Sequence, residues 1–201
     1  MPELRFPWIE VSILLPMFGA LWVHFLGNSE KALRHCVIIC ATTFALTVGE
    51  LIDFVSLGSF EAHDHWLFLD WLFSRDIFVV DELSAFQLPL VALIFLVTVM
   101  STLRTKAPRF SLRLTLVSES LMLATFSCRE SWTLIMLLVV STIPPYLELR
   151  QRERCSRIYV IHMGAFVVML LAGWAWLWFA HHGLLASCRY FPTSLVDDGP
   201  I

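Results

Sequence analysis

Long apolar runs alternate with short polar stretches along most of the chain. Six runs have the length of about 20 residues that a helix needs to cross a bilayer, and a helix satisfies its own backbone hydrogen bonds in lipid. A long connection follows the second run, over residues 56–81, and a polar tail occupies residues 181–201. We predict transmembrane helices over residues 8–26, 33–54, 83–103, 111–128, 131–149 and 157–180.

The composition excludes an ordinary soluble domain. Of the 201 residues, 58% are hydrophobic and 15% are charged, against about 25% charged residues in soluble domains. The mean hydropathy is +0.73, so a soluble chain of this size would leave more apolar surface than one core can bury. We therefore predict an all-α polytopic membrane protein, a bundle of six transmembrane helices in the lipid bilayer. The net charge of −3 gives no indication of a nucleic-acid partner.

The basic residues predict how the helices are oriented. If the helices alternate in direction, ten of the 14 Lys and Arg residues lie on the side opposite the N-terminus. Lys and Arg collect on the cytoplasmic side of membrane proteins. We therefore predict that both termini lie outside.

Glu119 is the one acid predicted to lie deep inside a span. A charged side chain at the bilayer centre costs about 2.5–3.5 kcal/mol on insertion scales, so such a group faces protein or water. Two interpretations stay open. Glu119 is either a proton-carrying group paired with a base on a neighbouring helix, or a structural carboxylate that is protonated or hydrogen-bonded to Ser118, Ser120 or a neighbouring hydroxyl.

Other polar groups in the predicted spans give weaker signals. Glu10, Glu50 and Asp53 lie near the external ends of the first two helices, where we expect them to be solvated. His162 lies about one turn from the inner surface and is a second proton-path candidate, because histidine titrates near physiological pH; a structural, hydrogen-bonded histidine is the alternative. No Lys lies inside any predicted span, so a relay of alternating Glu and Lys is not available within this chain.

Three prolines are candidates for helix kinks: Pro16, Pro89 and Pro144. Each lies inside a predicted helix, where proline removes a backbone hydrogen bond. Near Pro144 the carbonyl freed in this way is expected around Val140, a point where water can enter. No phosphate loop, nucleophile elbow, paired haem ligands or zinc-protease motif occurs in the sequence. We therefore predict no catalytic residue and no cofactor.

The cysteine and histidine patterns predict no metal site. Cys36 and Cys40 are one helical turn apart, and packing of two small apolar residues is favoured over a shared metal. His63 and His65 form a pair without a third fixed ligand. They begin a segment, 63–80, that we predict to lie in the membrane interface because it carries tryptophans among aliphatic residues.

Three stretches, taken in order, carry a family resemblance. ILLPMFGALWV at residues 13–23 has an LP-hydrophobic-GAL pattern, and FVVDELSAFQLPLVAL at 78–93 is similar to a "VDGLS" entry into a third helix. SLMLATFSCRESWTLIMLLVVSTIPPYL at 120–147 is similar to a fourth-to-fifth helix region ending in "FxWExxLIPxY". Together they resemble the N-terminal portion of the antiporter-like subunits of respiratory complex I. The M-type subunit (chain 4) is the most similar, and the Mrp antiporters are related.

The chain departs from this family where the family carries its pumping residues. The resemblance places the family's essential glutamate five residues before the proline, and that position is Val139 here. Glu130 matches a frequently acidic family position at a surface turn. The family's lysine-bearing helices would begin after the sixth predicted helix. The resemblance therefore implies that this chain does not pump by the family mechanism on its own.

The function implied by the resemblance is that of a divergent membrane-arm subunit of a complex I-like proton-translocating NADH:quinone oxidoreductase. It would support proton translocation within a larger assembly, as a non-catalytic subunit in the bacterial inner (cytoplasmic) membrane. Its partners would be other membrane subunits of a complex I-like or antiporter assembly. Two alternatives stay open: a structural or assembly membrane protein without an ion path, and an independent transporter or receptor that binds a ligand at His63, Asp64 and His65.

Overall fold

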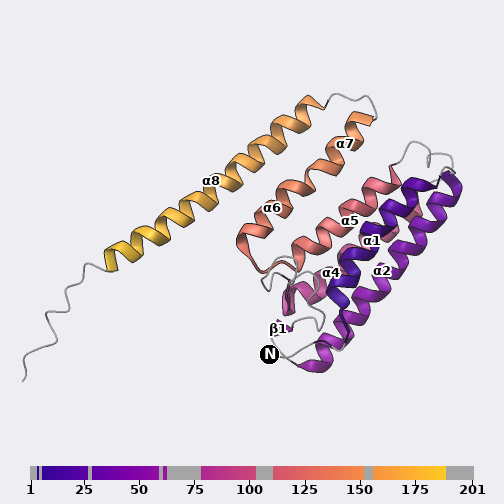
Figure 1. The fold of residues 1–201 in the computed structure, drawn as a ribbon, viewed down its shortest axis with the longest axis horizontal. Helices are drawn as coiled ribbons and strands as arrows, with labels where there is room; N and C mark the ends of the chain where they lie inside the picture. The colour runs from indigo at the N-terminus through magenta and orange to yellow at the C-terminus, as the bar shows by residue number, and fades with distance from the viewer. Residues whose placement is uncertain are drawn as a thin grey trace, which may run out of the picture. The chain divides into compact units, whose positions relative to one another are not determined.

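The computed structural model describes residues 4, 6–26, 29–58, 61–62, 78–102, 111–151 and 156–188. Its elements, in chain order, are α1 (Trp8–Phe25), α2 (Ser29–Leu57), β1 (Glu61–Ala62), β2 (Val80–Asp81), α4 (Glu82–Ser101), α5 (Leu112–Phe126), α6 (Ser131–Ser141), α7 (Ile143–Gln151) and α8 (Arg157–Cys188) (Figure 1). The prediction of an all-α fold is confirmed, since the strands within the described ranges have two residues each. The chain divides into two units, Met1–Ser156 and Arg157–Ile201.

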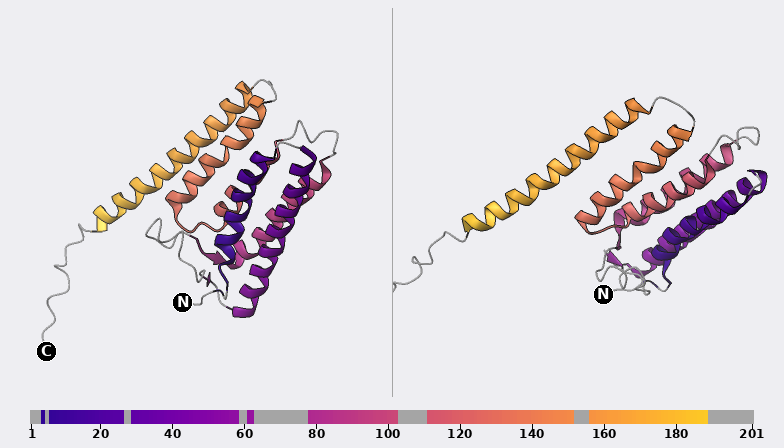
Figure 2. Two further views of the ribbon diagram at one scale, coloured as in Figure 1. Left: turned by 45° about the vertical axis from the view of Figure 1, so that its right-hand side comes forward. Right: turned by 45° about the horizontal axis from the view of Figure 1, so that its top comes forward.

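In the first unit, α1 packs antiparallel to both α2 and α5 (Figures 1 and 2). The indole nitrogen of Trp8 donates to Asp53 near the end of α2, at 3.1 Å. On the α5 side, the Ser120 hydroxyl donates to the Ile13 carbonyl at 2.8 Å, and Arg113 lies 3.0 Å from His24 at the far end of α1. The start of α1 therefore lies beside the end of α2, and the end of α1 lies beside the start of α5.

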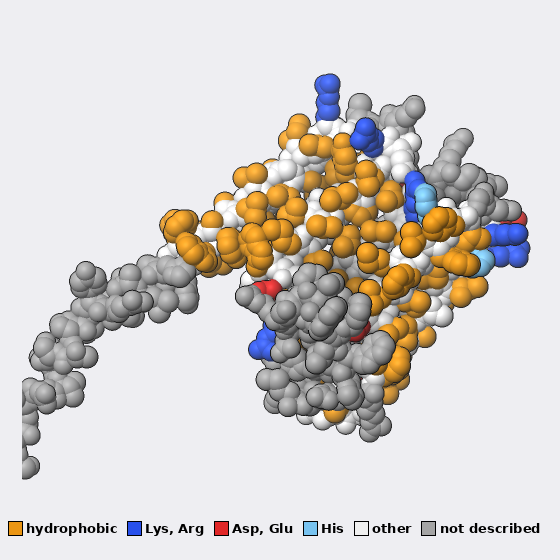
Figure 3. All heavy atoms as spheres, viewed as in Figure 1, with side chains coloured by type: hydrophobic (Ala, Val, Ile, Leu, Met, Phe, Trp, Pro, Cys, Tyr) orange, Lys and Arg blue, Asp and Glu red, His pale blue; other side chains and the backbone are white. Residues whose placement is uncertain are grey.

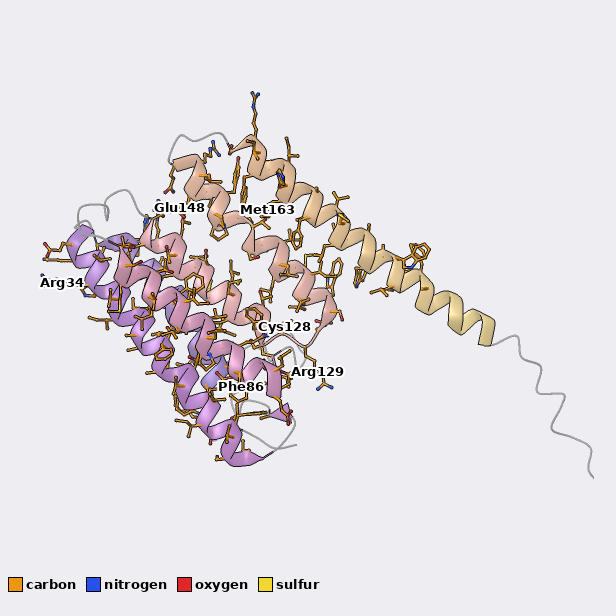
Figure 4. All side chains as sticks on the ribbon, turned by 180° about the vertical axis from the view of Figure 1, so that it is seen from behind. Arg34, Phe86, Cys128, Arg129, Glu148 and Met163 are labelled. Carbon is orange, nitrogen blue, oxygen red and sulfur yellow. The ribbon has the colours of Figure 1, made fainter. Side chains whose placement is uncertain are left out.

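Helix α4 packs most extensively against α2 and completes a four-helix bundle with α1 and α5. Phe54 near the end of α2 shares an apolar cluster with Leu88 near the start of α4. Leu33, near the start of α2, shares a second cluster with Val99 near the end of α4. Helices α2 and α4 are therefore antiparallel as well. Figure 4 agrees, because Phe86 of α4 and Arg34 of α2 lie at opposite ends of the bundle.

The start of α4 is fixed to the end of α5. Asp81 accepts from the backbone N–H of Ser84 at 2.7 Å, while the Ser84 hydroxyl accepts from the N–H of Asp81, forming a capping box. Just before this cap, the N–H of Val79 donates to the Ser127 carbonyl at 2.8 Å, and Phe78 pairs with Cys128. Strands β1 and β2 form a short antiparallel ladder beside these contacts.

Five helical segments of the described chain are long and apolar enough to cross a membrane: Trp8–Phe25, Glu30–Leu57, Glu82–Ser101, Ser131–Gln151 and Arg157–Ala180. Helix α5 occupies the fourth predicted span but has only 15 residues, about 22 Å of helix against a hydrocarbon core of about 30 Å. Its contacts with α1 nevertheless extend from Ile13 to His24. Helix α5 therefore lies alongside α1, which is long enough to cross the membrane.

The fifth predicted span is interrupted. Helix α6 ends at Ser141 and α7 begins at Ile143, with Thr142 as a turn between them. Pro144 and Pro145 lie in the first turn of α7, where proline is tolerated because the first N–H groups of a helix have no partner inside it. Both segments pack against α5.

Large apolar side chains cover the outside of the bundle (Figure 3). On α1 the exposed set is Met17, Phe18, Leu21, Trp22 and Phe25, each at least 56% accessible. On α4 it includes Leu83, Phe86, Leu90, Ile94 and Val97. An apolar surface of this extent is stable in lipid and would aggregate in water. The chain is therefore an integral membrane protein.

In the second unit the structure describes helix α8. Met163, labelled in Figure 4, lies on this helix. The helix is continuous over 32 residues. Its candidate span, Arg157–Ala180, has a mean hydropathy of 1.9, as expected for a helix that is apolar on all sides and lies in lipid.

Candidate functional site

The apolar core of the bundle is split into two clusters. The first includes Leu4, Ile9, Phe54, Leu88 and Leu123, at the end where α1 begins and α2 ends. The second lies at the opposite end and includes Val23, Leu33, Cys36, Val99 and Leu116. On α2 and α5, polar residues occupy the buried positions between the clusters: Thr43, Thr47 and Glu50 on α2, and Glu119 and Ser120 on α5.

Glu119 lies in this polar layer with no exposed surface. Its Oε2 accepts a hydrogen bond from the Cys40 thiol of α2, with 3.1 Å between sulfur and oxygen. Its Oε1 is buried without a hydrogen-bond partner among the described residues. No ion pair to Glu119 occurs among the described residues. The basic partner expected for a proton-carrying Glu119 is therefore not found in that part of the chain.

The hydrogen-bonding partner of Glu119 differs from the one expected. Ser120, a predicted partner, donates instead to the backbone carbonyl of Ile13 on α1. Cys40 was assigned to packing, and it is fully buried, but its thiol also binds the carboxyl group. The spacing of Cys36, Cys40, Thr43 and Thr47 carried a signal for this, because steps of four and three residues keep small polar side chains on one face of a helix.

Glu10 and Glu50 are buried, at 5% and 1% accessibility, so the prediction that they are solvated is wrong. The end of the bundle near them is covered by chain outside the four helices. Leu4, Ala62 and Val80 are fully buried in the apolar cluster at that end. Asp53, the third acid in this region, is partly buried and accepts from Trp8.

A carboxyl group in this setting has the means to hold and pass a proton. Its neutral form avoids an unpaired charge inside the membrane, which is costly. The Cys40 thiol supplies one hydrogen bond and fixes the side chain against α2. The second oxygen remains able to bond to water or to another proton carrier.

His162 belongs to α8 in the second unit, and Glu119 belongs to the first unit. Its Nδ1 lies 2.9 Å from the Ile158 carbonyl of its own helix. This contact fits the structural, hydrogen-bonded alternative for His162. Its role in a proton path stays a prediction.

The three prolines have different surroundings. Pro16 and Pro89 lie inside α1 and α4, which are continuous helices, so kinks at these positions stay predictions. Before Pro144, the N–H of Thr142 donates to the Val139 carbonyl at 3.2 Å. A free carbonyl around Val140 stays a prediction.

Some predicted features lie outside the described residues. They are His63, Asp64 and His65, most of the interfacial segment 63–80, and residues 189–201 of the tail. Within the described part of the chain, no group of three His, Cys, Asp or Glu side chains is arranged to hold a metal ion.

No protein-family model matches the chain. It is similar to NAD(P)H-quinone oxidoreductase chain 4 of Prochlorococcus marinus (strain NATL1A), with 24% identity over 192 residues, covering 89% of this chain and 36% of the relative. The same protein of Prochlorococcus marinus (strain MIT 9312) is 24% identical over 85% of this chain and 34% of its own length. That of Synechococcus sp. (strain WH7803) is 23% identical over 85% of this chain and 33% of its own length.

The chain spans about a third of the length of these relatives, between 33% and 36% of each. The identity is low, but the similarity extends over most of this chain and the relatives share one name. The predicted resemblance is therefore confirmed: this membrane chain is similar, over most of its length, to part of chain 4 of the NAD(P)H-quinone oxidoreductases.

Proposed function

We propose that the chain is a membrane subunit of a complex I-like NADH:quinone oxidoreductase and that it supports proton translocation through Glu119. The observation that carries this proposal is the setting of Glu119. The group is fully buried between two apolar clusters, with one oxygen bound to Cys40 and the other without a partner in the described chain. The names of the relatives supply the type of complex.

The subunit acts as part of a larger assembly and does not pump alone. No Lys or Arg is buried among the described residues, and Val139 stands where the family resemblance expects a glutamate. Redox chemistry with NADH, flavin and quinone then belongs to other subunits. This chain supplies part of the membrane domain through which protons move.

We assign the protein to the bacterial cytoplasmic membrane, with six spans and both termini outside. The charge asymmetry of the connections supports this orientation. The antiparallel packing of α1 with α2, of α2 with α4 and of α1 with α5 is consistent with helices that alternate across the membrane. Helix α5 counts as a span because it lies alongside α1.

The test of the assembly is native electrophoresis of membranes solubilised in mild detergent, followed by mass spectrometry of the proteins that migrate with this chain. We expect subunits of an NADH:quinone oxidoreductase, and we expect deletion of the chain to disturb their assembly. Migration as a small separate species, together with normal assembly and pumping in the deletion strain, would contradict the proposal.

Glu119 separates this function from that of a structural subunit without an ion path. If Glu119 carries protons, Glu119→Gln lowers proton movement in a correctly assembled complex, because the amide has a similar shape but cannot titrate. If the chain is only structural, the same variant assembles and pumps normally.

A further inference from the structure

One buried face of α2 carries a row of two cysteines, two threonines and a glutamate inside the bundle. Cys36, Cys40, Thr43 and Thr47 have no exposed surface, and Glu50 has 1%. Steps of four, three, four and three residues keep these side chains on one side of a helix. With a rise of 1.5 Å per residue, the row extends over about 21 Å, roughly two thirds of the thickness of a hydrocarbon core.

The two threonines of this row keep an open acceptor. The Thr43 hydroxyl donates to the Ile39 carbonyl at 3.0 Å, and that of Thr47 donates to the Phe44 carbonyl at 2.9 Å. A hydroxyl that donates one hydrogen bond still has lone pairs to accept another. Each threonine can therefore accept a hydrogen bond from a water molecule beside the row, and it passes a proton on when its hydroxyl rotates away from the backbone carbonyl.

A second observation comes from another helix. Glu119 of α5 points at this row, because its Oε2 accepts from Cys40. Its other oxygen is fully buried and has no partner among the described residues. Buried polar atoms are nearly always hydrogen-bonded to protein or ordered water. The free oxygen of Glu119 thus indicates a ligand such as water beside the row.

Both ends of the row lie at an apolar cluster, and one of these ends leads to a partly exposed acid. Cys36 lies in the apolar cluster with Leu33, Val99 and Leu112. Glu50 lies within one helical turn of Asp53, which is partly exposed and accepts from Trp8. A polar ligand moving along the row from Glu119 would therefore reach the surface at the Asp53 end.

We propose that the buried face of α2 is a proton route from Glu119, past Thr43 and Thr47, to Glu50 and Asp53. This route rests on the proposed function, and it names the path that the proton follows. The proton leaves the Glu119 carboxyl for a water molecule. Each water or hydroxyl then accepts one proton and releases one, so that Glu119 ends as a carboxylate and Glu50 as a carboxylic acid. Successive groups are about 4.5–6 Å apart along the helix, a gap that one bridging water can close.

The test is hydrogen–deuterium exchange of the Cys40 thiol and the Glu119 carboxyl, followed by infrared spectroscopy of the full chain in lipid nanodiscs. Their bands are assigned from spectra of Cys40→Ala and Glu119→Gln. Thr43→Val with Thr47→Val removes both hydroxyls and keeps the side-chain shape. Thr42→Val is the matched control, since Thr42 is exposed on the same helix and also donates to backbone carbonyls.

We expect both groups to exchange in the wild type and in Thr42→Val. In the double variant, exchange should slow on the order of tenfold, the factor expected when one net hydrogen bond is lost from the route. Circular dichroism confirms that the variants fold alike. Equal exchange rates in the double variant, or no exchange in the wild type, would overturn the route.

Failure of the route and failure of the proposed function give different results. If the route is wrong and Glu119→Gln still lowers proton translocation, Glu119 is reached from another side and the function stands. If the double variant slows exchange while Glu119→Gln translocates normally, the route conducts protons to a group that the complex does not use.

Discussion

One glutamate inside an apolar bundle is the residue on which the proposed function rests. Glu119 is held by the Cys40 thiol and has no basic partner in the described part of the chain. A thiol is a weak donor, so it fixes the carboxyl group without neutralising it. This differs from a buried ion pair, in which a basic partner would favour the charged carboxylate.

The Cys40 hydrogen bond should be measurable as stability. Cys40→Val removes the donor and leaves Oε2 of Glu119 without the partner that the structure shows, at an expected cost of about 1–3 kcal/mol. Cys40→Ser keeps a donor of similar size and should cost much less. Thermal unfolding of the purified chain in detergent compares the two. Equal midpoints for both variants would show that the hydrogen bond contributes nothing.

Gly49 allows α1 and α2 to approach closely. A Cβ atom built at this position would lie 2.8 Å from the ring of Trp8, and a rigid aromatic ring cannot easily move away. Gly49→Ala should therefore destabilise the bundle by about 1–3 kcal/mol through overpacking. Gly164→Ala on α8 is the control, because a Cβ there meets nothing within 4 Å. The same unfolding assay distinguishes them, and equal stability would contradict the close contact.

At the level of the helices, the ends of α4 and α5 are joined by backbone contacts and a side-chain cap. Asp81 starts α4, and the preceding residues bind the Ser127–Cys128 turn after α5. These contacts cover the end of the bundle that contains Glu50. The cap therefore supports the apolar cluster that shields the buried acids.

Removing the cap should loosen that end. Asp81→Ala leaves the Ser84 N–H without its side-chain acceptor and should cost about 1 kcal/mol, whereas Asp81→Asn keeps an acceptor oxygen and should cost less. Amide hydrogen exchange measures the effect locally. Faster exchange in the first turn of α4 is expected for Asp81→Ala alone, and unchanged exchange would count against the cap.

The helices were predictable because each apolar run is long and uninterrupted. The predicted range 8–26 corresponds to α1 at Trp8–Phe25, and 83–103 to α4 at Glu82–Ser101. The break at Thr142 was expected from Pro144 only as a kink. Its position depends on where the backbone can close a turn, which the proline alone does not specify.

The polar layer was predictable only in part. Glu119 was recognised from its depth in an apolar run, but its contact with Cys40 depends on how α2 and α5 are rotated about their axes. The burial of Glu10 and Glu50 depends on chain segments that fold over the end of the bundle. Those long-range contacts leave no local pattern in the sequence around the two acids.

For the molecule as a whole, the proposed orientation in the membrane rests on the distribution of Lys and Arg. Arg34 and Phe86 lie at opposite ends of the bundle (Figure 4), and Glu82 is exposed at the end of α4 near Phe86. With both termini outside, Glu82→Cys should react with an impermeant maleimide in intact cells. Arg34→Cys should react only after the membrane is permeabilised. The wild type gives the background labelling of the native cysteines. The reversed labelling pattern would show that the orientation is the opposite of the proposed one.

The most direct test of the proton role is the number of protons translocated per NADH oxidised, measured in inside-out membrane vesicles. The vesicles carry the wild type, Glu119→Gln, or Glu82→Gln as an exposed glutamate control on α4. With the amount of assembled complex matched, we predict that Glu119→Gln lowers this ratio and that Glu82→Gln leaves it unchanged. A wild-type ratio in Glu119→Gln would show that Glu119 carries no protons for the complex.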